Sequence, residues 1–400
     1  MASTRLSRNR EFVLLWSGQA LSSLGSQVSL VAYPLLVLAV THSAAKAGLV
    51  GFAQELPIAV LALPGGVLAD RVDRKRLLIA VDVLSALALL AIPVALLAGH
   101  LPFGVIVVVA AIDGAGFVLT YVTERGVLPQ LVAPEQLGEA VARNESRIFG
   151  AMLAGPFVGG VLFAAGRAFP FLADACSYVV GAITKFLISS DFQEERGAMK
   201  SWDPREGIRW LWERPFFRMV ALLFALGNPA FHGLLLLVVL LAKHHGASSA
   251  LVGVMLAMGA AGGLVGALLA PHLQRRLPPR FALVGENVML ALSLPLLLLA
   301  HNAILIGLIM AAAIVITPVT NSIVVGYRVA LTPDHLQGRV QAAQTLISFS
   351  VGWLGPLAIG LLFQLAGAEA TILVLTGWAL GLVIVALASQ AFRHPPTLSG

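Results

Sequence analysis

The chain has 400 residues, of which 58% are hydrophobic and 12% are charged, and its formal net charge is +6. Soluble proteins carry about 25% charged residues, so this composition excludes an ordinary soluble enzyme. The apolar residues form blocks of about 20 residues or more, the length that an α-helix needs to cross a bilayer. We therefore expect an all-α, multi-pass membrane protein.

Twelve such blocks follow one another, separated by short stretches that contain charged residues, proline or glycine. The first begins near Phe12, after Arg5, Arg8 and Arg10. It is too long for the core of a signal peptide, so we expect it to be retained as the first span. The centres of the predicted spans lie near residues 26, 58, 87, 115, 151, 179, 230, 261, 290, 316, 352 and 380.

The basic residues lie on one side of the predicted membrane. All of the 26 Lys and Arg residues except Lys46, Arg167 and Lys243 fall on the same side as the N-terminus. The positive-inside rule therefore places both termini in the cytoplasm. Because the basic residues are explained by topology, we expect no nucleic-acid partner.

A charged motif joins the second and third predicted spans and reads Gly-Val-Leu-Ala-Asp-Arg-Val-Asp-Arg-Lys over residues 66–75. Gly66 would let two helices approach closely, and Asp70 can bind a helix N-terminus or a cation. Arg71 and Arg74 can bind lipid phosphates. We expect this cluster to latch two helix bundles at the inner surface. A solvated turn with basic anchors is the alternative.

Some carboxylates fall at membrane depth, where a charge is costly unless it faces a cavity or a partner. Asp113 in the fourth span is the deepest, and Glu55 in the second span is also well inside. Both are candidate proton carriers, with a structural role as the alternative. Asp82 and Glu286 lie closer to the inner surface, and we expect them to pair with nearby arginines.

The fifth predicted span carries Gly155, Pro156, Gly159 and Gly160. Proline removes a backbone donor and permits a bend, and the small residues allow another helix to pack closely. A gating interface and ordinary helix packing are both open. The eighth span offers a plausible partner through its own small residues, which are Gly259, Gly262, Gly263 and Gly266.

Landmarks of the first half return about 200 residues later. Residues 131–137 resemble residues 331–336, and in both segments we expect a helix start with proline in its first turn and, in the second, Thr332 as N-cap. The Gly-Pro pair at 155–156 returns at 355–356. Two six-span halves related by an axis normal to the membrane are typical of transporters that rock around a central cavity.

The two halves are predicted to be separate bundles, formed by residues 1–190 and 216–400. Residues 191–215 make the longest polar stretch and contain Trp202, Trp210 and Trp212 among charged residues. This pattern predicts a cytoplasmic amphipathic linker at the membrane surface.

Polar side chains inside the spans are the candidates for a substrate cavity. In the first span, Gln19, Ser23 and Gln27 share one helical face. Asn228 and His232 lie four residues apart in the seventh span, although a buried histidine is often only structural. Asn321 lies in the tenth span. Few polar groups among many Leu, Phe and Met residues favour an amphipathic organic substrate.

These motifs carry a resemblance to a known family. Residues 66–75 resemble the signature G-x-L-x-D-R-x-G-R-K of the major facilitator superfamily, with Asp73 in place of a glycine. The form D-R-x-D-R is similar to the drug and siderophore exporter branch, which includes macrolide-efflux and enterobactin-exporter-like proteins. Residues 155–160 resemble the motif of proton-coupled exporters, with Ala151 where that motif usually has a further glycine.

The resemblance implies the fold of that superfamily, with twelve transmembrane helices in two pseudo-symmetric six-helix bundles. It also implies a multidrug-type secondary transporter that exports a drug, siderophore or secondary metabolite by alternating access and proton antiport. We expect a monomer in a bacterial-type inner membrane, without cofactor or metal. No enzymatic activity is expected, because the HExxH and GxSxG patterns are absent. The alternatives are an importer or lipid flippase of this fold, and a transport-inactive receptor or scaffold.

Overall fold

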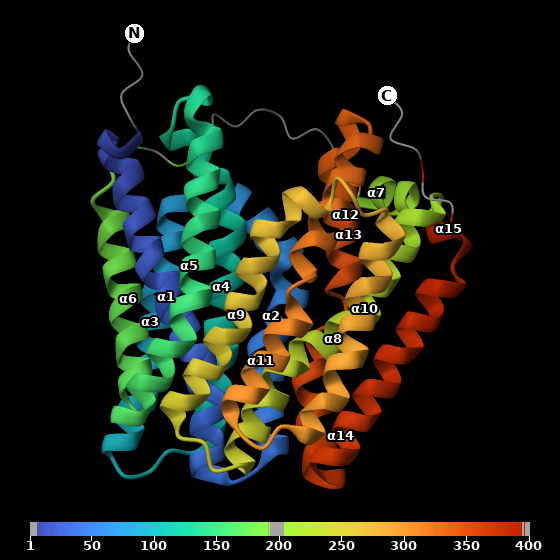
Figure 1. Ribbon diagram of the computed structural model, residues 1–400. Coiled ribbons are helices and arrows are strands. Elements are labelled where there is room, and N and C mark those ends of the chain that lie inside the picture. Colours follow the sequence, from blue (N-terminus) through green and yellow to red (C-terminus); the bar gives the residue numbers. More distant parts are fainter. Residues whose placement is uncertain (1–5, 191, 193–203, 394–395, 397–400) are drawn as a thin grey trace. The chain divides into compact units, whose positions relative to one another are not determined.

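The computed structural model describes residues 6–190, 192, 204–393 and 396, and these residues contain helices but no strand (Figure 1). They fall into two compact units, one within residues 1–199 and 248–253 and the other within residues 200–247 and 254–400. The first unit contains η1 (Leu6–Arg8), α1 (Arg10–Thr41), α2 (Ala44–Arg71), α3 (Arg74–Leu97), α4 (Phe103–Leu131), η2 (Pro134–Gln136), α5 (Leu137–Ala165) and α6 (Phe169–Phe186).

The start of α9 belongs to the first unit, and the rest of α9 belongs to the second. The second unit, like the first, is helical in its described residues. Its elements are α7 (Pro204–Trp212), α8 (Pro215–His244), α9 (Ser249–Leu273), α10 (Pro279–Leu296), η3 (Leu297–Leu299), α11 (Ala303–Ile314), α12 (Thr317–Leu331), η4 (Asp334–Leu336), α13 (Gln337–Ser348), α14 (Leu354–Ala388) and α15 (Gln390–Arg393).

Within the described residues, ten helical segments are long and apolar enough to cross a membrane. One of them, α14, consists of two limbs, because Gly367 has a φ of 82° that breaks the helix. The second limb of α14 and the 18-residue α6 lie at the places of the twelfth and sixth predicted spans. This arrangement is consistent with twelve spans, and the prediction of an all-α membrane fold is confirmed.

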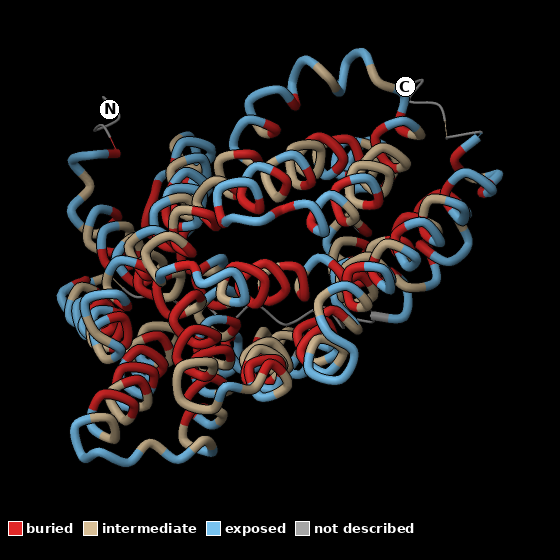
Figure 2. Tube along the Cα trace, turned by 60° about the horizontal axis from the view of Figure 1, so that its bottom comes forward, coloured by how far each residue is buried: buried red, intermediate tan, exposed pale blue. Residues whose placement is uncertain are grey.

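The surfaces of both units carry large apolar side chains. Figure 2 shows buried and exposed residues alternating around the helices. Exposed apolar patches of this extent are rare on soluble proteins and fit a surface that contacts lipid. Among the most exposed are Leu84, Leu87, Leu97, Leu268, Leu365 and Ile384.

The predicted repeat is visible in matching helix ends. Helix α4 ends at Leu131 and α12 ends at Leu331, and a short 3₁₀ turn follows each before the next helix. The prediction that Thr332 caps a helix start was wrong. Thr332 instead closes α12, and its Oγ1 has no hydrogen-bond partner among the described residues.

The predicted linker is described only in part, since residues 191 and 193–203, including Trp202, lie outside the described residues. Residues 204–212 form the amphipathic helix α7, which packs against α13 in the second unit. Trp210 is buried, with its ring centroid 5.1 Å from that of Phe217 and the Arg214 guanidinium 4.0 Å above it. Trp212 on the other side is exposed.

Candidate functional site

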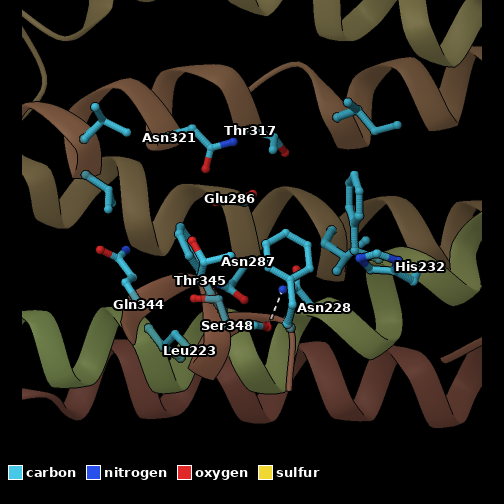
Figure 3. A pocket seen from close by; sticks show the side chains of 18 of the residues that line it. Leu223, Asn228, His232, Glu286, Asn287, Thr317, Asn321, Gln344, Thr345 and Ser348 are labelled. Atoms are coloured by element: carbon cyan, nitrogen blue, oxygen red, sulfur yellow. Dashed lines mark hydrogen bonds between the residues drawn. The ribbon is translucent and has the colours of Figure 1, made fainter. Parts of the chain in front are cut away.

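A cavity of about 400 Å³ opens between helices of the second unit (Figure 3). This volume lies in the range of small-molecule sites, which are mainly apolar and carry a few placed polar groups. The walls come mainly from α8, α10, α12 and α13. Its polar lining consists of Asn228, His232, Glu286, Asn287, Thr317, Asn321, Arg328, Gln341, Gln344, Thr345 and Ser348, and its apolar lining includes Leu223, Phe224, Phe231, Leu290, Ile314, Val324 and Phe349.

Three of the predicted cavity residues, Asn228, His232 and Asn321, line this space. The amide of Asn228 donates a hydrogen bond to the carbonyl oxygen of Ser348, which ties α8 to the end of α13 (Figure 3). The ring of His232 stands edge-on to Phe349, with 6.0 Å between their centroids. The polar side chains of α8 therefore both line the cavity and hold its walls together.

The other three predicted cavity residues belong to the first unit and do not line this cavity. Gln19 is almost fully buried in α1, whereas Ser23 and Gln27 are partly exposed. The Cβ and backbone of Gln27 lie against Gly155 of α5. Gln27 therefore takes part in helix packing.

Glu286 also lines the cavity, and it was not predicted to do so. It lies beside the hydroxyls of Thr317 and Thr320, which belong to α12. The predicted pairing with an arginine was wrong, because none of the ion pairs formed by the described residues includes Glu286. An acid without an ion-pair partner thus faces the cavity.

Asp82 and Glu286 lie at matching places in the two halves, six residues after Arg76 and Arg280, but only Asp82 has an ion-pair partner among the described residues. Asp82 of α3 pairs with Lys185 of α6, so the predicted pairing with an arginine was wrong here too. In the second half, the last span is residues 368–388, and it contains no Lys or Arg. Comparison of the two halves could have revealed that Glu286 lacks a counterpart of Lys185.

The charged motif at residues 66–75 forms a compact turn. Asp70 accepts a hydrogen bond from Arg74 Nη2 at 3.0 Å and is half exposed, and Arg71 is exposed. Arg74 also donates to the carbonyl oxygen of Gly126 at 2.9 Å, so it holds α4 and is mostly buried. The binding of lipid phosphates by Arg71 and Arg74 stays a prediction.

Within the first unit, no other helix approaches Gly66: outside its own helix, no atom lies within 4 Å of the place that a Cβ on Gly66 would take. The preceding residue, Gly65, faces Leu119 of α4 instead, where an added Cβ would lie 3.0 Å from Leu119 Cδ2.

The small residues of α5 pack within the first unit. An added Cβ would meet Gln27 at Gly155, Val28 at Gly159 and Gly253 at Gly160, and Pro156 lies between them inside the helix. Gly253 lies near the start of α9, so the eighth span does pack against α5, but not through the four glycines that were predicted. Gly259, Gly262 and Gly266 instead face Met310, Ala311 and Val315, at or beside α11 in the second unit.

The candidate proton carrier Asp113 is buried in the first unit, with 3% of its surface exposed. Its Oδ1 accepts from the Tyr178 hydroxyl at 3.1 Å, and its Oδ2 accepts from Gln54 Nε2 at 3.2 Å. Asp174 of α6 is fully buried and interacts electrostatically with Asp113. The other candidate, Glu55, lies on α2 and is partly buried. Asp174 stands out in the sequence as an acid near the outer end of the sixth span, but its proximity to Asp113 was not predicted, because the sequence does not tell which helices pack together.

Comparison with known proteins gives relatives and fold neighbours. The chain is 27% identical to the multidrug efflux pump Tap of Mycolicibacterium fortuitum over 397 residues, covering 92% of this chain and 93% of that protein. It is 29% identical to macrolide efflux protein A of Streptococcus pyogenes over 182 residues, 44% of each protein.

Among solved structures, a bacterial homologue of the iron transporter ferroportin has a TM-score of 0.72 at 19% identity, covering 96% of this chain and 99% of that chain. At this identity the likeness concerns the fold alone. The profile of the family matches residues 15–356, which is most of the chain. The protein with this cavity and these buried acids therefore belongs to the Major Facilitator Superfamily.

Proposed function

We propose that this transporter exports amphipathic small molecules such as drugs by alternating access. Family membership makes the chain a multi-pass transport protein and not an enzyme. The proposal depends on one observation above all, a cavity of about 400 Å³ whose walls combine apolar side chains with a few polar groups. The names of the relatives, multidrug efflux pump and macrolide efflux protein, support export of organic molecules.

Glu286 favours substrates that carry a basic nitrogen. It is a lining acid without an ion-pair partner among the described residues. Arg328 lies in the same lining, but its guanidinium already donates to Gln344 Oε1 at 3.3 Å. A charged substrate group that reaches Glu286 would gain attraction in a low-dielectric site.

The proposal also names the coupling ion and the membrane in which the transporter lies. We infer proton antiport with Asp113 as a carrier, supported by its burial and by its bonds to Tyr178 and Gln54. The excess of basic residues on one side supports cytoplasmic termini in a bacterial inner membrane. We further propose that the monomer is the working unit and that it needs no cofactor.

Flux in proteoliposomes of known orientation tests the function. The probes are a fluorescent lipophilic amine and a neutral analogue, each followed with and without a pH gradient. Export predicts movement away from the cytoplasmic face, and movement in the opposite direction would favour an importer. Movement of a fluorescent phospholipid alone would favour a flippase, and movement of no probe would favour a receptor or scaffold.

Filling the cavity should stop transport. Thr345→Trp places a large side chain in the cavity lining, and we expect the flux of both probes to fall at least about tenfold, ~1.4 kcal/mol in the barrier. The matched control is Leu87→Trp, which adds the same side chain on the exposed surface of α3 and should leave flux unchanged. Flux at the wild-type rate in Thr345→Trp would show that this cavity is not on the transport path.

A further inference from the structure

The buried acids of the first unit differ in whether a basic side chain forms an ion pair with them. Asp82 has Lys185 as its ion-pair partner, and Glu124 has Arg147, with 3.1 Å between Glu124 Oε2 and Arg147 Nη2. Asp113 and Asp174 are buried as deeply as these acids. Neither occurs in any ion pair within the part of the chain that the structure describes. We call Asp113 and Asp174 the acid pair.

Uncharged donors surround the acid pair. Asp113 accepts from Tyr178 and Gln54, and the Tyr178 hydroxyl also lies 3.1 Å from Ser26 Oγ. Asp174 Oδ1 accepts from Ser177 Oγ at 3.2 Å. Asp174 Oδ2 has no hydrogen-bond partner among the described residues, although the residue is fully buried.

The titratable groups around the acid pair supply no positive charge. Tyr33 of α1 interacts electrostatically with both carboxylates, and so does Tyr178 of α6. Asp82 of α3 interacts with Tyr178, and its own charge is matched by Lys185. On α2, Glu55 follows Gln54, which bonds to Asp113. These groups are acids or phenols, apart from the lysine already paired with Asp82.

The packing leaves little room for a metal ion beside Asp174. Helix α1 approaches so closely at Gly25 that an added Cβ would overlap Asp174 Oδ1 and Ser177 Oγ. Helix α4 is equally close to α2, since a Cβ on Gly114 would overlap the carbonyl oxygen of Gln54. A proton needs no such space.

From these contacts we propose that the acid pair is the proton-binding site of the transporter, with Asp174 as a second carrier beside Asp113. Two unpaired carboxylates in a buried site are costly, and protonation removes that charge without any added ligand. On binding, a proton adds to a carboxylate oxygen, and on release the carboxylate is regenerated, with no other bond changed. Its link to transport rests on the proposed function.

The depth of each carboxylate in the membrane follows from its position within its helix. Asp174 lies five residues after the start of α6 at Phe169, and Asp113 lies ten residues after the start of α4 at Phe103. Both helices begin on the side opposite the N-terminus in the predicted topology. Protons from outside would therefore meet Asp174 first, and the hydroxyls of Tyr33 and Tyr178 lie near both carboxylates.

Infrared spectroscopy of the purified full-length protein tests the pair without transport. At neutral pH, exposed carboxyl groups are ionised, so a protonated acid is recognised by its own C=O stretch. We expect Asp113→Asn and Asp174→Asn each to reduce this signal and the double variant to reduce it further. Glu139→Gln removes a carboxylate on the exposed surface of α5, so it is the control and should leave the signal unchanged. Any signal from Glu286 persists in all four variants.

Three outcomes would overturn the proposal. The signal could be the same in wild type and in both single variants, or sodium ions at constant pH could abolish it, which would indicate a cation site. Alternatively, the pH-gradient dependence of amine flux could persist undiminished in the double variant. Asp174→Glu keeps a carboxyl group and should retain the signal, which separates lost chemistry from lost folding. If the wild type transports no probe, the proposed function fails while the infrared result still decides whether the pair binds protons.

Discussion

Lys185→Met is expected to destabilise the protein by about 3–5 kcal/mol, because it leaves Asp82 buried without its cation. Both side chains are only 1% exposed, and Lys185 Nζ donates directly to Asp82 Oδ2. Methionine keeps most of the volume of lysine, so the effect should come from the unpaired charge. The cost should appear as a lower melting temperature of the purified protein in detergent.

The matched variants separate charge from packing. Adding Asp82→Asn to Lys185→Met removes the orphaned charge, and most of the lost stability should return, because replacing both members of a buried pair is often close to neutral. Arg143→Met breaks a surface pair with Glu139, whose two charges lie 2.8 Å apart, and should change stability little. Equal melting temperatures for wild type and Lys185→Met would refute the structural role of this ion pair.

The crossings of the membrane could be predicted because a span is a local property. About 20 apolar residues are needed for each crossing, whichever helices pack around it. The helix breaks that fall inside predicted spans were not predicted. They lie at residues 315–316, between α11 and α12, and at residues 349–353, between α13 and α14, where the sequence stays apolar. Gly367, in contrast, lies between the eleventh and twelfth predicted spans.

The candidate site was only partly predictable because charge pairing is not local. Asn228, His232 and Asn321 were found as polar residues inside apolar spans, which is visible in the sequence. The partner of Asp82 lies 103 residues away, on a helix whose neighbours the sequence does not specify. The same limitation applied to Glu286 and Asp174, whose importance depends on the absence of such a partner.

Glu286→Gln is expected to slow transport of the lipophilic amine about tenfold, equivalent to ~1.4 kcal/mol. Glutamine has nearly the same size and can still bond to Thr317 and Thr320, so the cavity should keep its shape. The attraction between the carboxylate and a basic nitrogen is lost, and this attraction is strong where water is excluded. A neutral analogue has no such attraction to lose.

The comparison of the two probes distinguishes recognition of charge from general damage. The neutral analogue should change less than about twofold in Glu286→Gln, since only the charge term is removed. Asn287→Ser alters the next residue of α10, which lines the same cavity without charge, and should affect both probes equally. An equal loss for amine and neutral analogue in Glu286→Gln would mean that Glu286 shapes the cavity but does not select a basic group. Unchanged flux of both would exclude Glu286 from recognition, because a carboxylate that meets the substrate in this cavity must influence a charged molecule more than a neutral one.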